Sequence, residues 1–188
     1  MDKETFRGFL ALPLSKETKR YVTQVASSIR HPNDDCKWVL EDNYHITLRF
    51  LDEITPSKAK EVMDALREKL TVRDQLSLAL GQLHYLPNLR HPRVLACLVR
   101  PINDVLKLFW NIENILASFD FRADKHGYIP HVTLARTTRV LDFVLSDYAD
   151  DRTPLVAKEI VLYQSLQEAH GVKYHKLDSI ALEEVHAE

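Results

Sequence analysis

Glycine is scarce in this sequence, and its scarcity excludes several nucleotide-binding motifs. Only four of the 188 residues are glycine. They stand too far apart for a GxGxxG turn or a P-loop anywhere in the chain. The sequence also lacks a GxSxG elbow, an HExxH pair and an EF-hand loop. If the protein handles a phosphate group, side chains rather than a glycine-rich loop must hold it.

Cysteines and long apolar runs are also few. Cys36 and Cys97 are the only cysteines and form no CxxC pattern, which argues against a zinc ribbon and a disulfide scaffold and predicts two buried free thiols. No apolar run approaches the roughly 20 residues that a membrane helix needs. The start, Met1-Asp2-Lys3-Glu4, lacks the layout of a signal peptide. We therefore expect a cytoplasmic protein without membrane contacts.

A strong charge of one sign is missing too. With 25 basic and 27 acidic residues, the formal net charge is −2. This balance excludes a strongly cationic protein that wraps nucleic acid, so any contact with nucleic acid must be local. The apolar fraction of 45% is normal for a folded chain. The length of residues 1–188 predicts a single domain, or two small lobes that share a core.

Helix-like and strand-like segments alternate along the chain without a linker. Helices are predicted from Ser15 to about residue 30, from Thr55 to 70, from Pro101 to 119, and near 141–148. Strands are predicted at 5–12, 37–40, 44–51, 76–85, 93–100, 129–135, 159–165 and 172–182. The connections at 41–43 and 167–171 are too short for parallel crossovers. An α+β fold with mixed or antiparallel sheets is therefore favoured.

The most informative feature is a short internal repeat. His45-Ile46-Thr47-Leu48 recurs as His131-Val132-Thr133-Leu134, each time within a predicted strand. Alternation places the His and the Thr of each copy on one face, about 6 to 7 Å apart, and the apolar residues on the other face. Two such strands side by side would form a cleft with two imidazoles and two hydroxyls.

This set of groups suits in-line chemistry at phosphorus. One neutral imidazole can take a proton from an attacking water, while the other, when protonated, donates to the departing oxygen. The threonine hydroxyls can donate hydrogen bonds to the non-bridging oxygens. The chemistry requires no metal. Metal ligation by the two histidines is the weaker alternative, because no cysteine or third histidine stands at ligand-like spacing.

In these motifs the sequence resembles the 2H phosphoesterases, and within them the RNA 2′,3′-cyclic phosphodiesterases, also called 2′-5′ RNA ligases. The similarity extends in order over segments 6–14, 38–51, 91–95, 130–136 and 162–165. The resemblance implies a two-lobed α+β fold with a pseudo-twofold axis, helices packed outside the sheets, and a central cleft. It also implies hydrolysis of a 2′,3′-cyclic phosphate to a 2′-phosphomonoester without a metal or another cofactor, with reversible 2′-5′ ligation in some members.

The resemblance also implies roles for particular residues. His45 and His131 are the expected catalytic residues, and Thr47 and Thr133 are expected to bind the phosphate. His45 is the working choice for the acid and His131 for the base, although the near-equivalence of the two motifs leaves these roles open. Arg136 is expected to clamp the phosphate. Strict alternation places Arg136 on the face opposite His131, unless the strand ends or bulges at Ala135.

Three further residues have less specific expectations. Arg49 shares the strand parity of His45 and is expected either to reach a neighbouring RNA phosphate or to be solvated. Phe9 matches an aromatic of the family's first strand and either stacks on a base or packs in the core. Asp52 stands where the family commonly has a glycine, which predicts a changed turn.

The substrate leaves two alternatives open. The expected partner is an RNA with a 2′,3′-cyclic phosphate end, tRNA-derived ends included, bound by a monomer. One alternative is a binding module for nucleotides or RNA ends without turnover. The other is a phosphodiesterase that acts on a small cyclic phosphate derived from a nucleotide.

Overall fold

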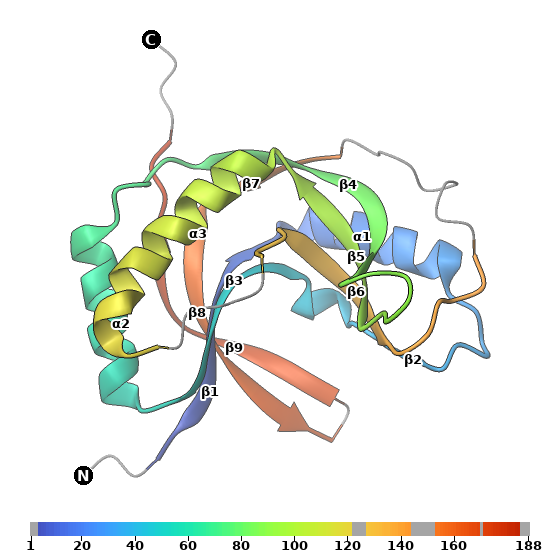
Figure 1. Cartoon of the computed structure of the whole chain (residues 1–188), viewed down its shortest axis with the longest axis horizontal. Helices are drawn as coiled ribbons and strands as arrows, with labels where there is room; N and C mark the ends of the chain where they lie inside the picture. The colour runs from blue at the N-terminus through green and yellow to red at the C-terminus, as the bar shows by residue number, and fades with distance from the viewer. Residues whose placement is uncertain (1–3, 122–126, 144–152, 170, 185–188) are drawn as a thin grey trace.

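One sheet runs through the described part of the computed structural model, which comprises residues 4–121, 127–143, 153–169 and 171–184. Its nine strands are β1 (Phe6–Pro13), β2 (Cys36–Trp38), β3 (His45–Ile54), β4 (Leu76–Leu86), β5 (Val94–Arg100), β6 (His131–Thr137), β7 (Pro154–Ala157), β8 (Glu159–Glu168) and β9 (Gly171–Ala181). They are hydrogen-bonded in the order β7-β4-β5-β6-β3-β1-β8-β9, and β2 also pairs with β6. Every pairing between these strands is antiparallel, and the sheet curls into a half barrel (Figure 1).

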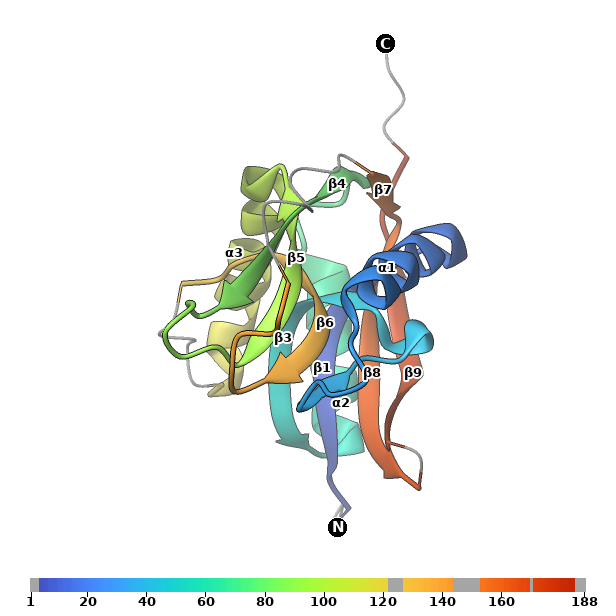
Figure 2. The same cartoon turned by 90° about the vertical axis from the view of Figure 1, so that its right-hand side faces the viewer.

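Within the described residues, three α-helices pack on this sheet: α1 (Lys16–Ile29), α2 (Pro56–Lys69) and α3 (Ile102–Leu116). As predicted, the side chains of Ser15 and Thr55 cap the first two, accepting hydrogen bonds from backbone N–H groups of the first turn. The helices α2 and α3 lie together on one side of the molecule and α1 lies on another (Figure 2). This arrangement agrees with the predicted α+β fold with helices packed outside the sheet.

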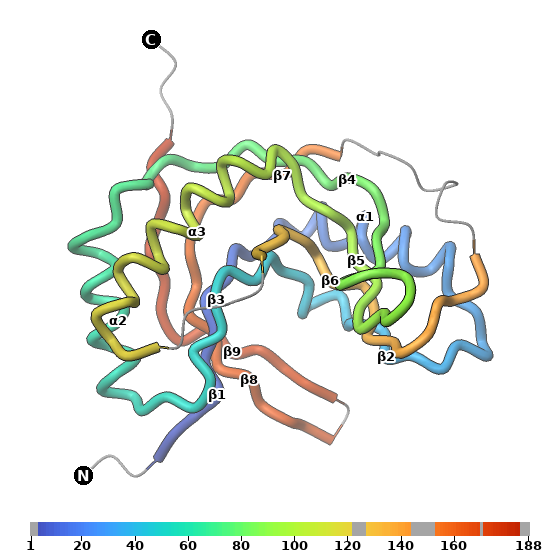
Figure 3. The backbone as a smooth tube through the Cα atoms, viewed as in Figure 1, coloured from blue at the N-terminus to red at the C-terminus, as the bar shows by residue number. Residues whose placement is uncertain are grey.

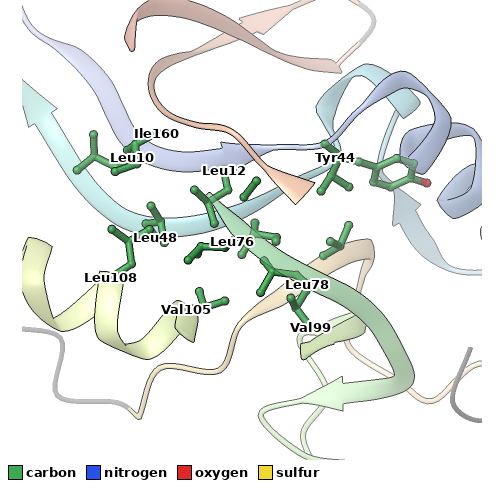
Figure 4. Packing of buried hydrophobic residues seen from close by; sticks show 14 of the residues in the cluster. Leu10, Leu12, Tyr44, Leu48, Leu76, Leu78, Val99, Val105, Leu108 and Ile160 are labelled. Carbon is green, nitrogen blue, oxygen red and sulfur yellow. The ribbon is translucent and has the colours of Figure 1, made fainter. Parts of the chain in front are cut away.

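Apolar residues from the strands fill the space between the sheet and the helices. Leu48 of β3 lies beside Leu108 of α3 in this core (Figure 4). Ile46 and Val132, at the centres of the two H-x-T motifs, have no exposed surface. The apolar sides of both motif strands are therefore anchored in the core, as the alternation predicts, and this leaves the opposite face for the polar side chains.

Most of the predicted elements are confirmed, with three differences. The predicted turn at 41–43 is a short 3-10 helix, η1 (Glu41–Asn43). The strand β7 is absent from the prediction, because it has only four residues and begins with a proline. Residues 141–143 of the predicted helix near 141–148 are not helical, and the rest of that segment lies outside the described residues.

Two sequence predictions about cysteines and membranes can also be compared with the structure. Both thiols are free, as predicted, and Cys97 is buried, whereas Cys36 is only half-buried. Burial raises the pKa of the Cys97 thiol to about 12. Among the described residues, the helices are too short or too polar to cross a membrane.

Candidate active site

The strands that carry the two H-x-T motifs are neighbours in the sheet. β3 and β6 pair antiparallel, with Ile46 directly opposite Val132. Continuing this register places His45 across from Thr133 and Thr47 across from His131, with a local pseudo-twofold axis between the two apolar residues. Side chains that face each other across two strands lie about 5 Å apart at Cβ. The structure thus brings together the four residues that were predicted from the repeat.

Each imidazole is held by the same backbone contact. His45 Nδ1 lies 2.7 Å from the carbonyl oxygen of Asn43, and His131 Nδ1 lies 2.7 Å from that of Ile129. A carbonyl oxygen only accepts hydrogen bonds, so Nδ1 carries the proton in both rings and Nε2 is the atom that gains or loses one. His45 Nε2 lies 2.9 Å from Thr47 Oγ1, which places it on the polar face of β3.

The surroundings favour the neutral form of both imidazoles in the free protein. The pKa of His45 is lowered to about 4, mainly by burial and to a smaller extent by the nearby His131, Lys19 and Arg136, against the opposing effect of the Asn43 carbonyl. The pKa of His131 is also lowered, first by burial and then by Arg136. A bound phosphate anion would act in the opposite direction, because it stabilises a charged imidazole.

A bulge in β3 changes which side chains follow Thr47 on the cleft face. Ala11 of β1 pairs with Thr47 and Leu10 pairs with Arg49, so Leu48 is an extra residue. The extra residue reverses the alternation. Arg49 consequently points toward α3 and forms an ion pair with Glu113 at 2.9 Å, with both side chains 11% exposed. The predicted parity of Arg49 is therefore wrong, and Phe50 takes the place on the cleft face.

A bulge at the corresponding point of β6 brings Arg136 to the cleft. Ala96 of β5 pairs with Thr133 and Leu95 pairs with Ala135, which leaves Leu134 as the extra residue. Leu134 and Ala135 are both fully buried, and the next residue, Arg136, is exposed. The bulge that was considered at Ala135 exists one residue earlier. It places Arg136 on the same face as His131 and Thr133.

Aromatic side chains from β1 and β9 pack against the imidazole of His45. The ring centroids of Phe9 and Tyr174 lie 5.0 Å and 5.2 Å from that of His45, and the Tyr174 ring is perpendicular to the imidazole at 88°. Phe9 is only 2% exposed, whereas Phe50, 5.9 Å from it, is 57% exposed. Two roles were considered for Phe9, stacking on a base and packing in the core, and its burial agrees with packing. Phe50 is the aromatic side chain that is accessible from the cleft.

A cavity of about 670 Å³ adjoins this cluster. Residues of the β8–β9 hairpin, among them Ser165, Val172 and Tyr174, form one wall of the cavity. This hairpin extends away from the helices (Figure 3). The cavity is lined by aromatic, cationic and apolar side chains, which include Phe9, Phe50, Trp38, Tyr174, Arg7, Lys37 and Arg136.

Two residues that tie the site together were missed by the sequence analysis. Asn43 donates from Nδ2 to the carbonyl oxygen of Val172 at 2.6 Å, which joins the 3-10 turn before His45 to the β8–β9 hairpin. Tyr128 donates from its hydroxyl to the carbonyl oxygen of Thr47 at 2.8 Å. Both contacts link segments more than 80 residues apart, so the only sequence signal was their closeness to a motif.

The chain is similar to several known proteins. The family model of LigT-like phosphoesterases matches residues 12–96. The RNA 2′,3′-cyclic phosphodiesterase of Methanocaldococcus jannaschii is 26% identical over 174 residues, which cover 89% of this chain and 96% of that protein. The protein of the same name from Thermotoga maritima is 25% identical over 130 residues, which cover 69% of each chain. The crystal structure of Escherichia coli LigT complexed with 3′-AMP has a TM-score of 0.83 at 23% identity and covers 95% of this chain and 99% of its own. In its motifs, its fold and these relatives, this chain is similar to the LigT-like phosphoesterases of the 2H phosphoesterase superfamily.

Proposed function

We propose that this protein hydrolyses the 2′,3′-cyclic phosphate at the end of an RNA to a 2′-phosphomonoester, with His45 and His131 as acid and base. The observation that carries this proposal is the paired geometry of the two motifs. Each imidazole is oriented by a backbone carbonyl, and each lies across from the threonine of the other strand. Relatives with the name RNA 2′,3′-cyclic phosphodiesterase support the choice of substrate.

The proposed reaction moves one proton at each histidine. Nε2 of His131 takes a proton from water as its oxygen attacks phosphorus, and Nε2 of His45 donates a proton to O3′ as the P–O3′ bond breaks. The phosphate remains on O2′. Thr47 and Thr133 donate to the non-bridging oxygens, and Arg136 balances the charge that gathers there. If the 5′-hydroxyl of a second RNA replaces water, the same steps form a 2′-5′ linkage.

Phe50 is the residue that we propose for contact with the terminal base. The bulge in β3 turns its ring to the cleft face, where 57% of the residue is exposed. Stacking of a base on an aromatic side chain contributes about 1 to 3 kcal/mol and tolerates different bases. The buried Phe9 ring packs between Phe50 and His45, 5.9 Å and 5.0 Å from their ring centroids.

The decisive experiment follows the products of a short RNA that ends in a 2′,3′-cyclic phosphate, with EDTA present. We expect a 2′-phosphate from the wild type, and a rate lower by about 10² to 10⁴ from His45→Ala and from His131→Ala. His31→Ala is the matched control, because His31 is an exposed histidine in the turn after α1. Binding of the cyclic end without turnover would favour the binding module, and turnover that EDTA abolishes would favour a metal-dependent reaction.

A further inference from the structure

The strand β2 adds a second cationic side chain beside the predicted phosphate clamp. Lys37 of β2 pairs directly with Arg136 of β6. Directly paired residues share a face of the sheet and lie about 5 Å apart at Cβ. Because Arg136 lies on the face of His131, Lys37 lies there too. Both side chains are exposed and line the 670 Å³ cavity.

The charged residues that line the cavity are mainly positive, whereas the whole chain has a small negative net charge. Three cationic side chains and a single carboxylate, that of Asp52, are among its lining residues, whereas the formal net charge of the protein is −2. Neither Lys37 nor Arg136 takes part in an ion pair with another of the described residues. The two motifs and Arg136 are sufficient for one phosphate, so Lys37 is available for another anion.

We propose that Lys37 binds the phosphodiester on the 5′ side of the terminal nucleotide, so that the cleft prefers RNA of two or more nucleotides to a nucleoside cyclic phosphate. This inference rests on the proposed function and narrows its substrate. Consecutive phosphates of an RNA chain are separated by one nucleoside, and Lys37 lies directly across from Arg136, near the end of β6 that is farther from His131. A flexible ammonium group binds a phosphodiester as a point charge and does not require a fixed orientation.

Three substrates with the same terminal nucleoside 2′,3′-cyclic phosphate test the subsite. They are the nucleoside alone, the dinucleotide, and the dinucleotide with an uncharged methylphosphonate linkage. We expect the wild type to have the highest kcat/KM for the charged dinucleotide. Lys37→Gln should lower that value about fivefold and leave the other two unchanged. It should also reduce the slope of log kcat/KM against log salt concentration for the charged dinucleotide by about 0.7.

Lys158→Gln is the matched control, because Lys158 is an exposed lysine between β7 and β8 that does not line the cavity. Equal kcat/KM values for the nucleoside and the charged dinucleotide would overturn the subsite, as would an equal loss on all three substrates in Lys37→Gln. Both results would leave the proposed function intact. If the wild type turned over none of the three, the proposed function would fail. Equilibrium binding of the same compounds to the wild type and Lys37→Gln would then test the subsite alone.

Discussion

The two H-x-T strands share a backbone pattern but differ in what surrounds it. Each has a histidine held by the carbonyl two residues earlier, a threonine, and a bulge at the fourth position. The sixth position is Phe50 in β3 and Arg136 in β6. The same bulge therefore presents an aromatic ring at one end of the cleft and a cation at the other. We infer that one motif strand serves the nucleoside and the other serves the phosphate.

The supports of the two histidines differ as well. The turn that holds His45 is fastened to α1, since Lys19 donates to the Asp42 carbonyl at 2.6 Å and Thr23 donates to the Glu41 carboxylate at 2.9 Å. The carbonyl that holds His131 belongs to Ile129, which is 41% exposed. His45 therefore has a fixed environment, whereas His131 lies at a more accessible edge.

Replacing each of the two sixth residues with alanine tests this division most strongly. Arg136→Ala should lower kcat/KM about 10- to 100-fold for every cyclic phosphate, because it removes a charged contact to the reacting group. Phe50→Ala should raise KM and change kcat little, since stacking acts on the bound nucleoside before and during the reaction. Kinetics on a nucleoside 2′,3′-cyclic phosphate measure both effects. Similar kcat and KM changes in the two variants would contradict the division.

The lowered pKa values predict an acidic optimum. One imidazole must be neutral and the other protonated, and kcat/KM reports the free protein. The pKa of His45 is lowered to about 4 and that of His131 lies below its ordinary 6.5, so the singly protonated pair becomes scarce above pH 6.5. We expect kcat/KM to be highest below pH 6.5 and to fall about tenfold per unit above it.

The pH profile of kcat/KM also measures how neighbouring charges change the pKa values of the two histidines. Arg136 lowers the pKa of both histidines, so Arg136→Ala should move the alkaline fall of kcat/KM to higher pH. In the wild type, kcat should begin to fall at a higher pH than kcat/KM does. The reason is that a bound phosphate anion favours the charged imidazole and so raises its pKa. A wild-type optimum of kcat/KM above pH 7 would contradict the expectation.

Asn43→Ala tests the special support of His45. Removing the side chain frees the β8–β9 hairpin at Val172, and both residues line the cavity. Loss of one hydrogen bond predicts a decrease of about fivefold in kcat/KM. Asn111→Ala is the control, because the Asn111 side chain also bonds to the backbone, here by accepting from the N–H groups of Thr71 and Val72, but does not line the cavity. Thermal unfolding should show lower stability in both variants, and only Asn43→Ala should lose activity.

The sequence predicts the motif strands well and the bulges poorly, for a physical reason. Alternation and the repeat place His45 near Thr47 because these features are local. A bulge depends on a partner strand, and no glycine marks either one. In β6 the consecutive apolar residues Leu134 and Ala135 break the alternation and so indicate the bulge. In β3 the corresponding residue is Arg49, which forms an ion pair with Glu113 of α3.

A second irregularity of β3 leads to the smallest expected effect. Gly8 pairs with Asp52 and Phe9 with Phe50, so Leu51 is unpaired, and Asp52 has a φ of 53°. The left-handed region costs an L-residue about 1 kcal/mol, and the entropy of glycine in the unfolded chain offsets part of any gain. Asp52→Gly should therefore stabilise the protein by about 0.5 kcal/mol, measured by chemical unfolding.

Asp120, outside the cavity and with a φ of 59°, is a matched site for this test. Asp120→Gly should give a similar gain in stability and leave kcat/KM unchanged. Asp52→Gly also removes the carboxylate from a cavity lined by three cationic side chains, so it should raise kcat/KM for an anionic substrate about twofold. Asp52→Ala should reproduce the kinetic gain without the stability gain, because alanine keeps the Cβ at a positive φ. Loss of activity in Asp52→Ala would instead mean that the carboxylate contacts the substrate favourably.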